Sequence, residues 1–240
     1  MRTLLGKYRL IVVLLSAFLV VPYNSFSMGA GSDQYSALRD NPNAPDVLAK
    51  MAEALKGIEA MDLLFEMTVT DQNGSVVGNF EGEVQSQGYA FKLLNPDLEV
   101  YCDGVSKWIY NVASAELTIF PNDTTQADLV ENPVGFLLSL NSGNSDFRKP
   151  GKAQYSKNPL DGRAVWSIEL TPKSRYAPYK GLTICVDASD YLPSVLMYKS
   201  ADDNTYTINI KSVRKLPLWP LSNFRFPQKM LPGLTVTDLR

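Results

Sequence analysis

Carboxylates and thiols are the side chains of this 240-residue chain whose types and spacing could do chemistry. Glu81 and Glu83 stand two residues apart, which points both from one face of a β-strand, and a pair of carboxylates can perform acid–base catalysis. A solvated strand face has the same spacing, and we expect that simpler arrangement here. Cys102 and Cys185 each lie inside an apolar run, so they either form a disulfide in an oxidising compartment or remain two buried free thiols.

The chain contains no histidine, and this excludes several classes of catalytic and metal site. Ser-His-Asp and Cys-His nucleophiles, histidine proton shuttles and His-ligated zinc sites are all impossible. Neither a glycine-rich phosphate loop nor a G-x-S-x-G nucleophile elbow nor a zincin motif occurs. Lys and Arg number 23 against 25 Asp and Glu, so no basic excess exists to neutralise a nucleic-acid backbone. We therefore expect a protein that is not an enzyme, holds no metal and does not bind nucleic acid.

Residues 1–27 have the pattern of a secretory signal peptide. Arg2, Lys7 and Arg9 form a basic start, and residues 10–21 are apolar except for one serine. This apolar run is shorter than the roughly 20 residues that a membrane-spanning helix needs, which favours a cleaved signal over an uncleaved anchor. No cysteine follows at which a lipid could be attached. We expect a soluble, exported mature protein.

The rest of the chain has the periodicity of regular elements. Apolar residues recur every three or four positions from Pro45 to Ile58 and predict an amphipathic helix. From Met61 the period becomes two, and turn signals such as Asn73-Gly74 separate the segments. The predicted strands are residues 61–70, 76–86, 89–94, 98–102, 107–112, 116–120, 153–157, 164–170, 182–186, 193–199 and 205–213. A second short helix is predicted within residues 128–140, where Pro133 can begin it.

Residues 45–240 are expected to form a single, mainly β domain of the α+β class. A leader over residues 28–44, rich in Gly, Ser, Asp, Asn and Pro, is expected to be flexible. The connections between strands are too short for helical crossovers, which predicts an antiparallel sheet. If such a sheet is strongly curved, it encloses an apolar concavity that helices can cover, as in carriers of hydrophobic ligands. The periodicity alone does not distinguish that concavity from a filled core.

Four segments resemble, in order, motifs of the LolA family of periplasmic lipoprotein carriers. They are Asp103-Gly104 with Trp108-Ile109-Tyr110-Asn111, Asn132-Pro133 with Phe136-Leu137-Leu138, Leu170-Thr171-Pro172-Lys173, and Phe224-Arg225-Phe226 with the ending from Pro232 to Arg240. Each motif is short, but the four occur in the order found in that family, and the resemblance covers about residues 46–240. This resemblance implies an unclosed, strongly curved antiparallel β half-barrel covered by short helices.

The resemblance also implies a function. A protein of this family would carry acylated lipoproteins across the periplasm, from an inner-membrane lipoprotein-releasing ABC transporter to an outer-membrane acceptor, as a monomer without a cofactor. An alternative within the same fold is a periplasmic sensor module that binds another lipid or an envelope protein. The missing lipid-anchor cysteine argues against an outer-membrane receptor, and the single domain argues against a two-domain sensor.

The resemblance and the strand pattern together give a candidate cavity for acyl chains. We expect the concave sheet face to carry Phe65, Met67, Phe80, Val84, Phe91, Leu93, Trp108 and Tyr110. We expect the helices to cover it with Leu48, Met51, Leu55, Phe136, Leu137 and Leu140. Well-known family members have an arginine shortly before the position of Phe91 that bonds to the lid helices, and Gln87 stands there in this chain. Because an amide lacks the five-donor fork of a guanidinium, the lid at this gating position is expected to be held differently, or the cavity to stand open more often.

Overall fold

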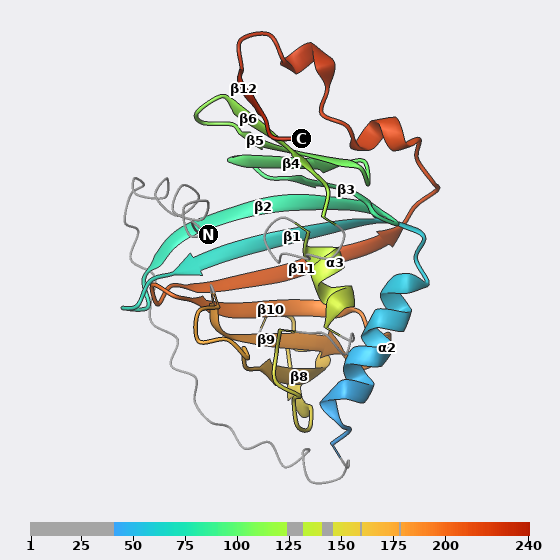
Figure 1. Ribbon diagram of the computed structural model, residues 1–240. Coiled ribbons are helices and arrows are strands. Elements are labelled where there is room, and N and C mark those ends of the chain that lie inside the picture. Colours follow the sequence, from blue (N-terminus) through green and yellow to red (C-terminus); the bar gives the residue numbers. More distant parts are fainter. Residues whose placement is uncertain (1–40, 124–131, 141–145, 159, 178) are drawn as a thin grey trace.

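The computed structural model describes residues 41–123, 132–140, 146–158, 160–177 and 179–240. Within them, twelve strands form one sheet in the order β12-β6-β5-β4-β3-β2-β1-β11-β10-β9-β8-β7 (Figure 1). Neighbouring strands are antiparallel, except that β12 runs parallel to β6. The two end strands of this order, β12 and β7, do not pair, so the sheet is not closed. The predicted fold class, an unclosed antiparallel half-barrel with short helices, is confirmed.

The elements follow one another along the chain as the periodicity predicts. The helices are α2 (Ala44–Lys56) and α3 (Pro133–Ser139), with two short 3-10 helices, η3 (Leu221–Phe224) and η4 (Gln228–Met230). The strands are β1 (Ala60–Thr70), β2 (Val76–Gln87), β3 (Ala90–Leu94), β4 (Leu98–Cys102), β5 (Ser106–Asn111), β6 (Glu116–Pro121), β7 (Gln154–Lys157), β8 (Ala164–Leu170), β9 (Tyr179–Asp187), β10 (Pro193–Ser200), β11 (Thr205–Lys215) and β12 (Thr235–Asp238). Each predicted strand is present, with ends that differ by at most three residues. The predicted signal peptide, residues 28–40 of the leader and residues 128–131 of the second predicted helix lie outside the described residues.

The amphipathic pattern at the start of the domain forms α2. Pro45 and Asp46 occupy its first turn, where a missing N–H costs nothing and a negative charge is favourable, and Lys56 occupies its last turn. One side of the helix is buried, and its buried residues are Ala44, Val47, Leu48, Met51, Ala52 and Leu55. In α3, Pro133 again begins the helix, and the side chain of Asn132 accepts a hydrogen bond from the backbone N–H of Gly135 at 2.9 Å.

The register of the strands sorts their side chains onto two faces. One cross-strand row runs over β11, β1, β2, β3, β4 and β5 and consists of Val213, Leu63, Val84, Leu93, Val100 and Ile109. This row packs in one apolar cluster with the buried residues of α2 and α3. We call the sheet surface that carries it the helix-covered face and the opposite surface the outer face. Figure 1 shows both helices lying across the same side of the sheet.

The C-terminal segment, residues 216–234, covers part of the outer face. Figure 1 shows it leaving the end of β11 and passing the ends of β2 and β3 before it reaches β12. Phe226 is buried there, and its ring lies 5.5 Å from the ring of Tyr101 and 5.5 Å from that of Tyr110. Arg225 pairs with Asp103 at 2.7 Å. The aromatic residues form a second apolar cluster, separate from the one beneath the helices.

The two cysteines are free and buried on opposite faces of the sheet. Cys102 belongs to the cluster beneath the helices, whereas Cys185 packs with Val165 and Val195 in a small cluster of the outer face. Since a disulfide requires side chains that point toward each other, the two thiols do not pair. Burial raises the pKa of both thiols. Among the described residues, no helix is long and apolar enough to cross a membrane.

Candidate functional site

The helix-covered face brings together most of the residues predicted to line an acyl cavity. Phe65, Val84, Phe91 and Leu93 are buried in its apolar cluster. Met67 and Phe80 are partly buried, pack against the same cluster and lie opposite each other on β1 and β2. The same face continues over the other half of the sheet with Leu196, Ile184 and Ile168 on β10, β9 and β8. The result is a continuous apolar surface.

A glycine makes room for the ring of Phe65 on this face. Phe65 of β1 lies opposite Gly82 of β2. A Cβ atom at position 82 would lie 2.3 Å from the Phe65 Cζ atom, closer than packed carbon atoms approach. The Phe65 ring therefore lies over the backbone of the neighbouring strand, which is possible because residue 82 has no side chain.

The predicted lid residues all lie in the same cluster. Leu48, Met51 and Leu55 of α2, and Phe136, Leu137 and Leu140 of the α3 segment, are buried with at most 7% of their surface exposed. Beneath α3 the support is aromatic, because the ring of Phe147 lies edge-on to Phe136 at 6.1 Å and stacks on Tyr179 at 5.5 Å. The helices thus contact the sheet through apolar and aromatic groups.

Polar contacts hold α2 at its start and on its exposed side. The backbone N–H of Ala44 donates to the carbonyl of Gly151 at 2.8 Å. The Lys50 Nζ atom donates to the hydroxyl of Tyr191 at 3.2 Å and lies 4.7 Å from the centre of that ring. Both contacts lie at the edge of the covered surface and leave its middle apolar.

Trp108 and Tyr110 do not lie on the helix-covered face, which corrects the predicted set. They belong to the outer-face cluster with Tyr101 and Phe226. On β5 it is Ile109 that packs against the cluster beneath the helices. The alternation of β5 is misleading because its outer side is also buried, by a C-terminal segment whose position strand periodicity does not reveal.

Gln87 also points away from the helices, which corrects its predicted place as a gating residue. Its Nε2 atom donates to the carbonyl of Trp219 at 2.9 Å, and its Oε1 atom accepts from the N–H of Trp219 at 2.7 Å. The side chain therefore pairs with the backbone of the C-terminal segment as a neighbouring strand would. Residues alternate between faces along β2, and with Val84 beneath the helices, position 87 points outward.

The carboxylates considered for catalysis lie on the outer face, as expected for a solvated strand surface. Glu81 is exposed and lies opposite Glu66, while Glu83 accepts a hydrogen bond from Gln85 at 2.5 Å. Glu66 pairs with Lys211 at 2.6 Å, and the hydrogen bond from this lysine lowers the pKa of the carboxyl group. The polar partners of these groups lie on the strand surface, away from the apolar cluster beneath the helices.

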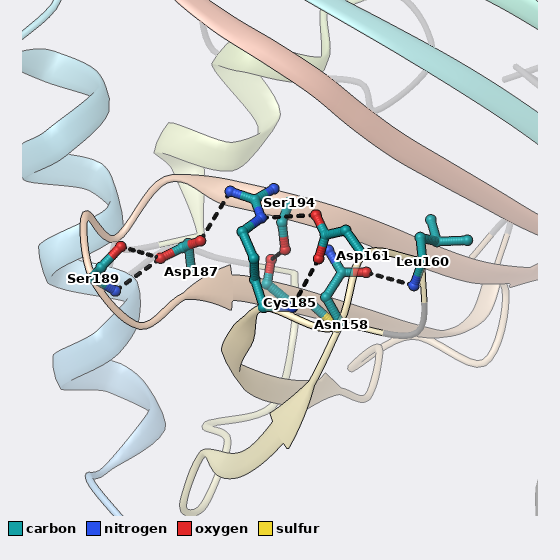
Figure 2. Close-up of polar contacts among 8 residues, drawn as sticks. Asn158, Leu160, Asp161, Cys185, Asp187, Ser189 and Ser194 are labelled. Carbon is teal, nitrogen blue, oxygen red and sulfur yellow. Dashed lines mark hydrogen bonds and ion pairs between the residues drawn. The ribbon is translucent and has the colours of Figure 1, made fainter.

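A polar cluster joins two turns at one end of the sheet (Figure 2). Arg163 contacts Asp161 at 2.7 Å and the buried Asp187 at 3.1 Å, and Ser189 donates to Asp187 through both its backbone N–H and its hydroxyl. Burial alone would raise the pKa of Asp187, but the hydrogen bonds from Ser189 and the charge of Arg163 outweigh it and hold this pKa below its usual value. The cluster fixes the turn before β8 to the turn after β9.

No protein-family model and no curated protein matches this chain, whereas several solved structures do. An uncharacterised conserved protein from Thermus thermophilus has 11% identity and a TM-score of 0.49, over 81% of this chain and 98% of that one. A LolA superfamily protein from Nitrosomonas europaea has 12% identity and a TM-score of 0.41, over 77% and 98%. A domain described as an outer membrane lipoprotein-sorting protein, from Vibrio parahaemolyticus, has 10% identity and a TM-score of 0.38, over 75% and 95%. A member of the LolA superfamily, the family whose motifs the sequence resembles, is therefore among the structures to which this chain is similar.

Proposed function

We propose that this protein is a periplasmic carrier that binds the acyl chains of lipoproteins between the helix-covered face and the two helices. The observation that carries the proposal is the continuous apolar face, covered by α2 and α3 rather than by a second sheet. An acyl chain offers about 0.8 kcal/mol for each methylene removed from water, and it needs no polar partner along its length. Cargo would arrive from an inner-membrane lipoprotein-releasing ABC transporter and leave to an outer-membrane acceptor, and the carrier would act as a monomer without a cofactor.

The way in which the helices are attached supports exchange of cargo. Apolar contacts have no preferred direction, so an acyl chain can replace a helix side chain against the sheet without leaving a polar group unpaired. α3 has seven residues, fewer than the roughly 12 that an isolated helix needs, so its position depends on packing against Phe147 and its neighbours. A lid of this kind can be displaced by a ligand of the same chemistry.

The binding step is tested with a fluorescent acyl probe and the variant Phe91→Glu. An ionised carboxylate in the middle of the apolar face is costly to desolvate, so we expect at least a tenfold weaker affinity, about 1.4 kcal/mol. Tyr89→Glu is the matched control, because Tyr89 is 76% exposed and stands two residues away in the chain. If Phe91→Glu does not fold, Met67→Glu at the partly buried end of the face replaces it. Unchanged uptake of the probe by a folded variant would show that acyl chains do not bind to this face.

The transport step is tested separately, with spheroplasts that contain an active lipoprotein-releasing transporter. We expect the mature protein to move an inner-membrane lipoprotein into the soluble fraction, and the measurement is the amount of lipoprotein there with and without added protein. Acyl-probe binding without lipoprotein release would leave a lipid-binding or sensing protein in place of a carrier.

A further inference from the structure

An open polar cavity of about 410 Å³ lies at the surface, at the edge of the sheet and outside the acyl-binding face, and its charged lining residues are exposed. Its walls come from the loop over residues 148–152, from Gln154 of β7 and from Ser167, Glu169 and Thr171 in and just after β8. The neighbours of these β8 residues, Ile168 and Leu170, belong to the cluster beneath the helices. Because side chains alternate along a strand, Ser167 and Glu169 point to the outer face.

The loop brings three cations to this cavity. Arg148, Lys149 and Lys152 all line it, and none of them forms an ion pair with any residue that the structure describes. Elsewhere in the described chain most arginines pair with aspartates, as Arg163, Arg214 and Arg225 do. In a chain whose formal net charge is −2, three such cations within five residues concentrate positive charge at one place.

Backbone hydrogen bonds hold this loop in position from both ends. At its start, the N–H of Arg148 donates to the carbonyl of Thr171 at 2.8 Å. At its end, Gly151 accepts from the N–H of Ala44, the first residue of α2, at 2.8 Å. The side chain of the preceding Phe147 is buried against α3. The backbone of the loop that carries the cations is therefore anchored, so a ligand does not have to order the loop backbone when it binds.

One acidic residue limits what the cavity can bind. Glu169 lines it together with the three cations, so the lining carries a net positive charge of about two at neutral pH. A phosphate ester carries one negative charge as a diester and up to two as a monoester, so either form is attracted to this lining, and the planar fork of Arg148 fits the phosphate oxygen atoms. Ser167 and Thr171 add hydroxyl groups that can donate to such oxygens. The volume exceeds that of a bare phosphate and suits a small phosphate ester.

We propose that the cavity lined by Arg148, Lys149 and Lys152 binds a phosphate ester, supplied either by a phospholipid headgroup or by a soluble glycerophosphate. This site is distinct from the acyl-binding face and does not rest on acyl binding. The cations take the phosphate oxygens, and the rest of the cavity takes the attached polyol.

The proposal is tested by titrating the full chain with glycerol 3-phosphate, with inorganic phosphate and with phosphatidylglycerol vesicles, against phosphatidylcholine vesicles. The double variant Arg148→Gln/Lys152→Gln should bind at least tenfold more weakly, and Glu169→Gln about threefold more tightly, because it removes the opposing charge. Lys215→Gln is the control, since it removes an exposed lysine from the end of β11. Gly151→Glu is a further test, because a Cβ atom at position 151 meets open space and the added carboxylate would compete with the ligand.

The outcomes distinguish a soluble ester from a phospholipid headgroup, and the phosphate site from the acyl site. Binding of glycerol 3-phosphate in solution supports a soluble ester, and binding of phosphatidylglycerol vesicles alone supports a headgroup. Equal affinities of the wild-type protein and the double variant, or no binding of any of these probes, would overturn the proposal. Acyl-probe uptake should be the same in the double variant and the wild type, so failure of the phosphate site and failure of the acyl site give different results.

Discussion

At the residue scale, single positions on the strands decide which side chains contact the helices and which contact the C-terminal segment. Phe65, Val84, Phe91 and Leu93 lie where alternation predicts them, because each is apolar on a strand whose opposite side is more polar. Trp108 and Tyr110 lie on the other face, because the more apolar side of β5 packs against the C-terminal segment and not against the helices, which alternation alone does not reveal. The gating role predicted for Gln87 comes from a family position. Gln87 stands three residues after Val84 on β2, so its side chain points to the outer face and not toward the helices.

Gly82 gives a prediction at this scale. Gly82→Ala should lower the free energy of unfolding by about 1 to 3 kcal/mol, because the added methyl group would displace the ring of Phe65. The matched control is Gly181→Ala on β9, where a Cβ atom would stay 3.9 Å from its nearest neighbour and the loss of backbone freedom in the unfolded chain should stabilise the protein slightly. Urea unfolding measures both, and equal stability of the two variants would show that Phe65 does not need the glycine.

Asp103 gives a prediction of pH dependence. Burial alone would raise its pKa, but hydrogen bonds from the backbone of Ser106 and Val105 and the contact with Arg225 outweigh it and lower this pKa. A carboxyl group whose pKa is lower in the folded state stabilises that state above its unfolded pKa of about 3.9 and loses this contribution as the pH falls through the folded pKa. Asp103→Asn should therefore be less stable than the wild type at pH 7, and the gap should close in acid. The exposed Asp97→Asn is the control, and a gap that stays constant from about pH 7 to pH 2 would contradict this assignment.

At the element scale, helices and strands with a regular spacing of apolar residues can be predicted from the sequence. Elements held only by backbone pairing with another strand cannot. Eleven strands and α2 follow from alternating or helical spacing of apolar residues. β12 does not, because its four residues are all exposed and its position depends on the backbone of β6. The C-terminal segment before it has no repeating pattern, yet it buries Phe224 and Phe226 against the sheet. Its docking depends on contacts between residues more than a hundred positions apart, which local patterns do not contain.

The attachment of the C-terminal segment gives a prediction for Gln87. Gln87→Ala removes two hydrogen bonds to the backbone of Trp219, each worth about 0.5 to 1.5 kcal/mol. The backbone amide of Trp219 should then exchange with deuterium faster, while the amides of α2 exchange as before. Acyl-probe entry should be unchanged. Faster probe entry with unchanged exchange at Trp219 would instead return Gln87 to the role of a gate.

At the scale of the whole molecule, the two faces of the open sheet are covered in different ways. The helix-covered face is closed by helices that pack through apolar contacts, and the outer face is partly closed by a segment fixed by Gln87, Asp103 and Phe226. A bound apolar chain would compete with α2 and α3 and leave the C-terminal segment in place. In the proposed carrier, cargo would exchange on the helix-covered side, and the contacts of the outer side would contribute stability.

The most direct test of acyl binding beneath the helices is the methyl spectrum of the protein with a spin-labelled fatty acid. We expect the paramagnetic label to broaden the methyl signals of Leu93, Ile168 and Leu137, which lie on the helix-covered face and on α3. The signals of Leu117 and Ile119, in the outer-face cluster, should remain sharp. Broadening of the Leu117 and Ile119 signals, with sharp signals from Leu93, Ile168 and Leu137, would contradict acyl binding beneath the helices.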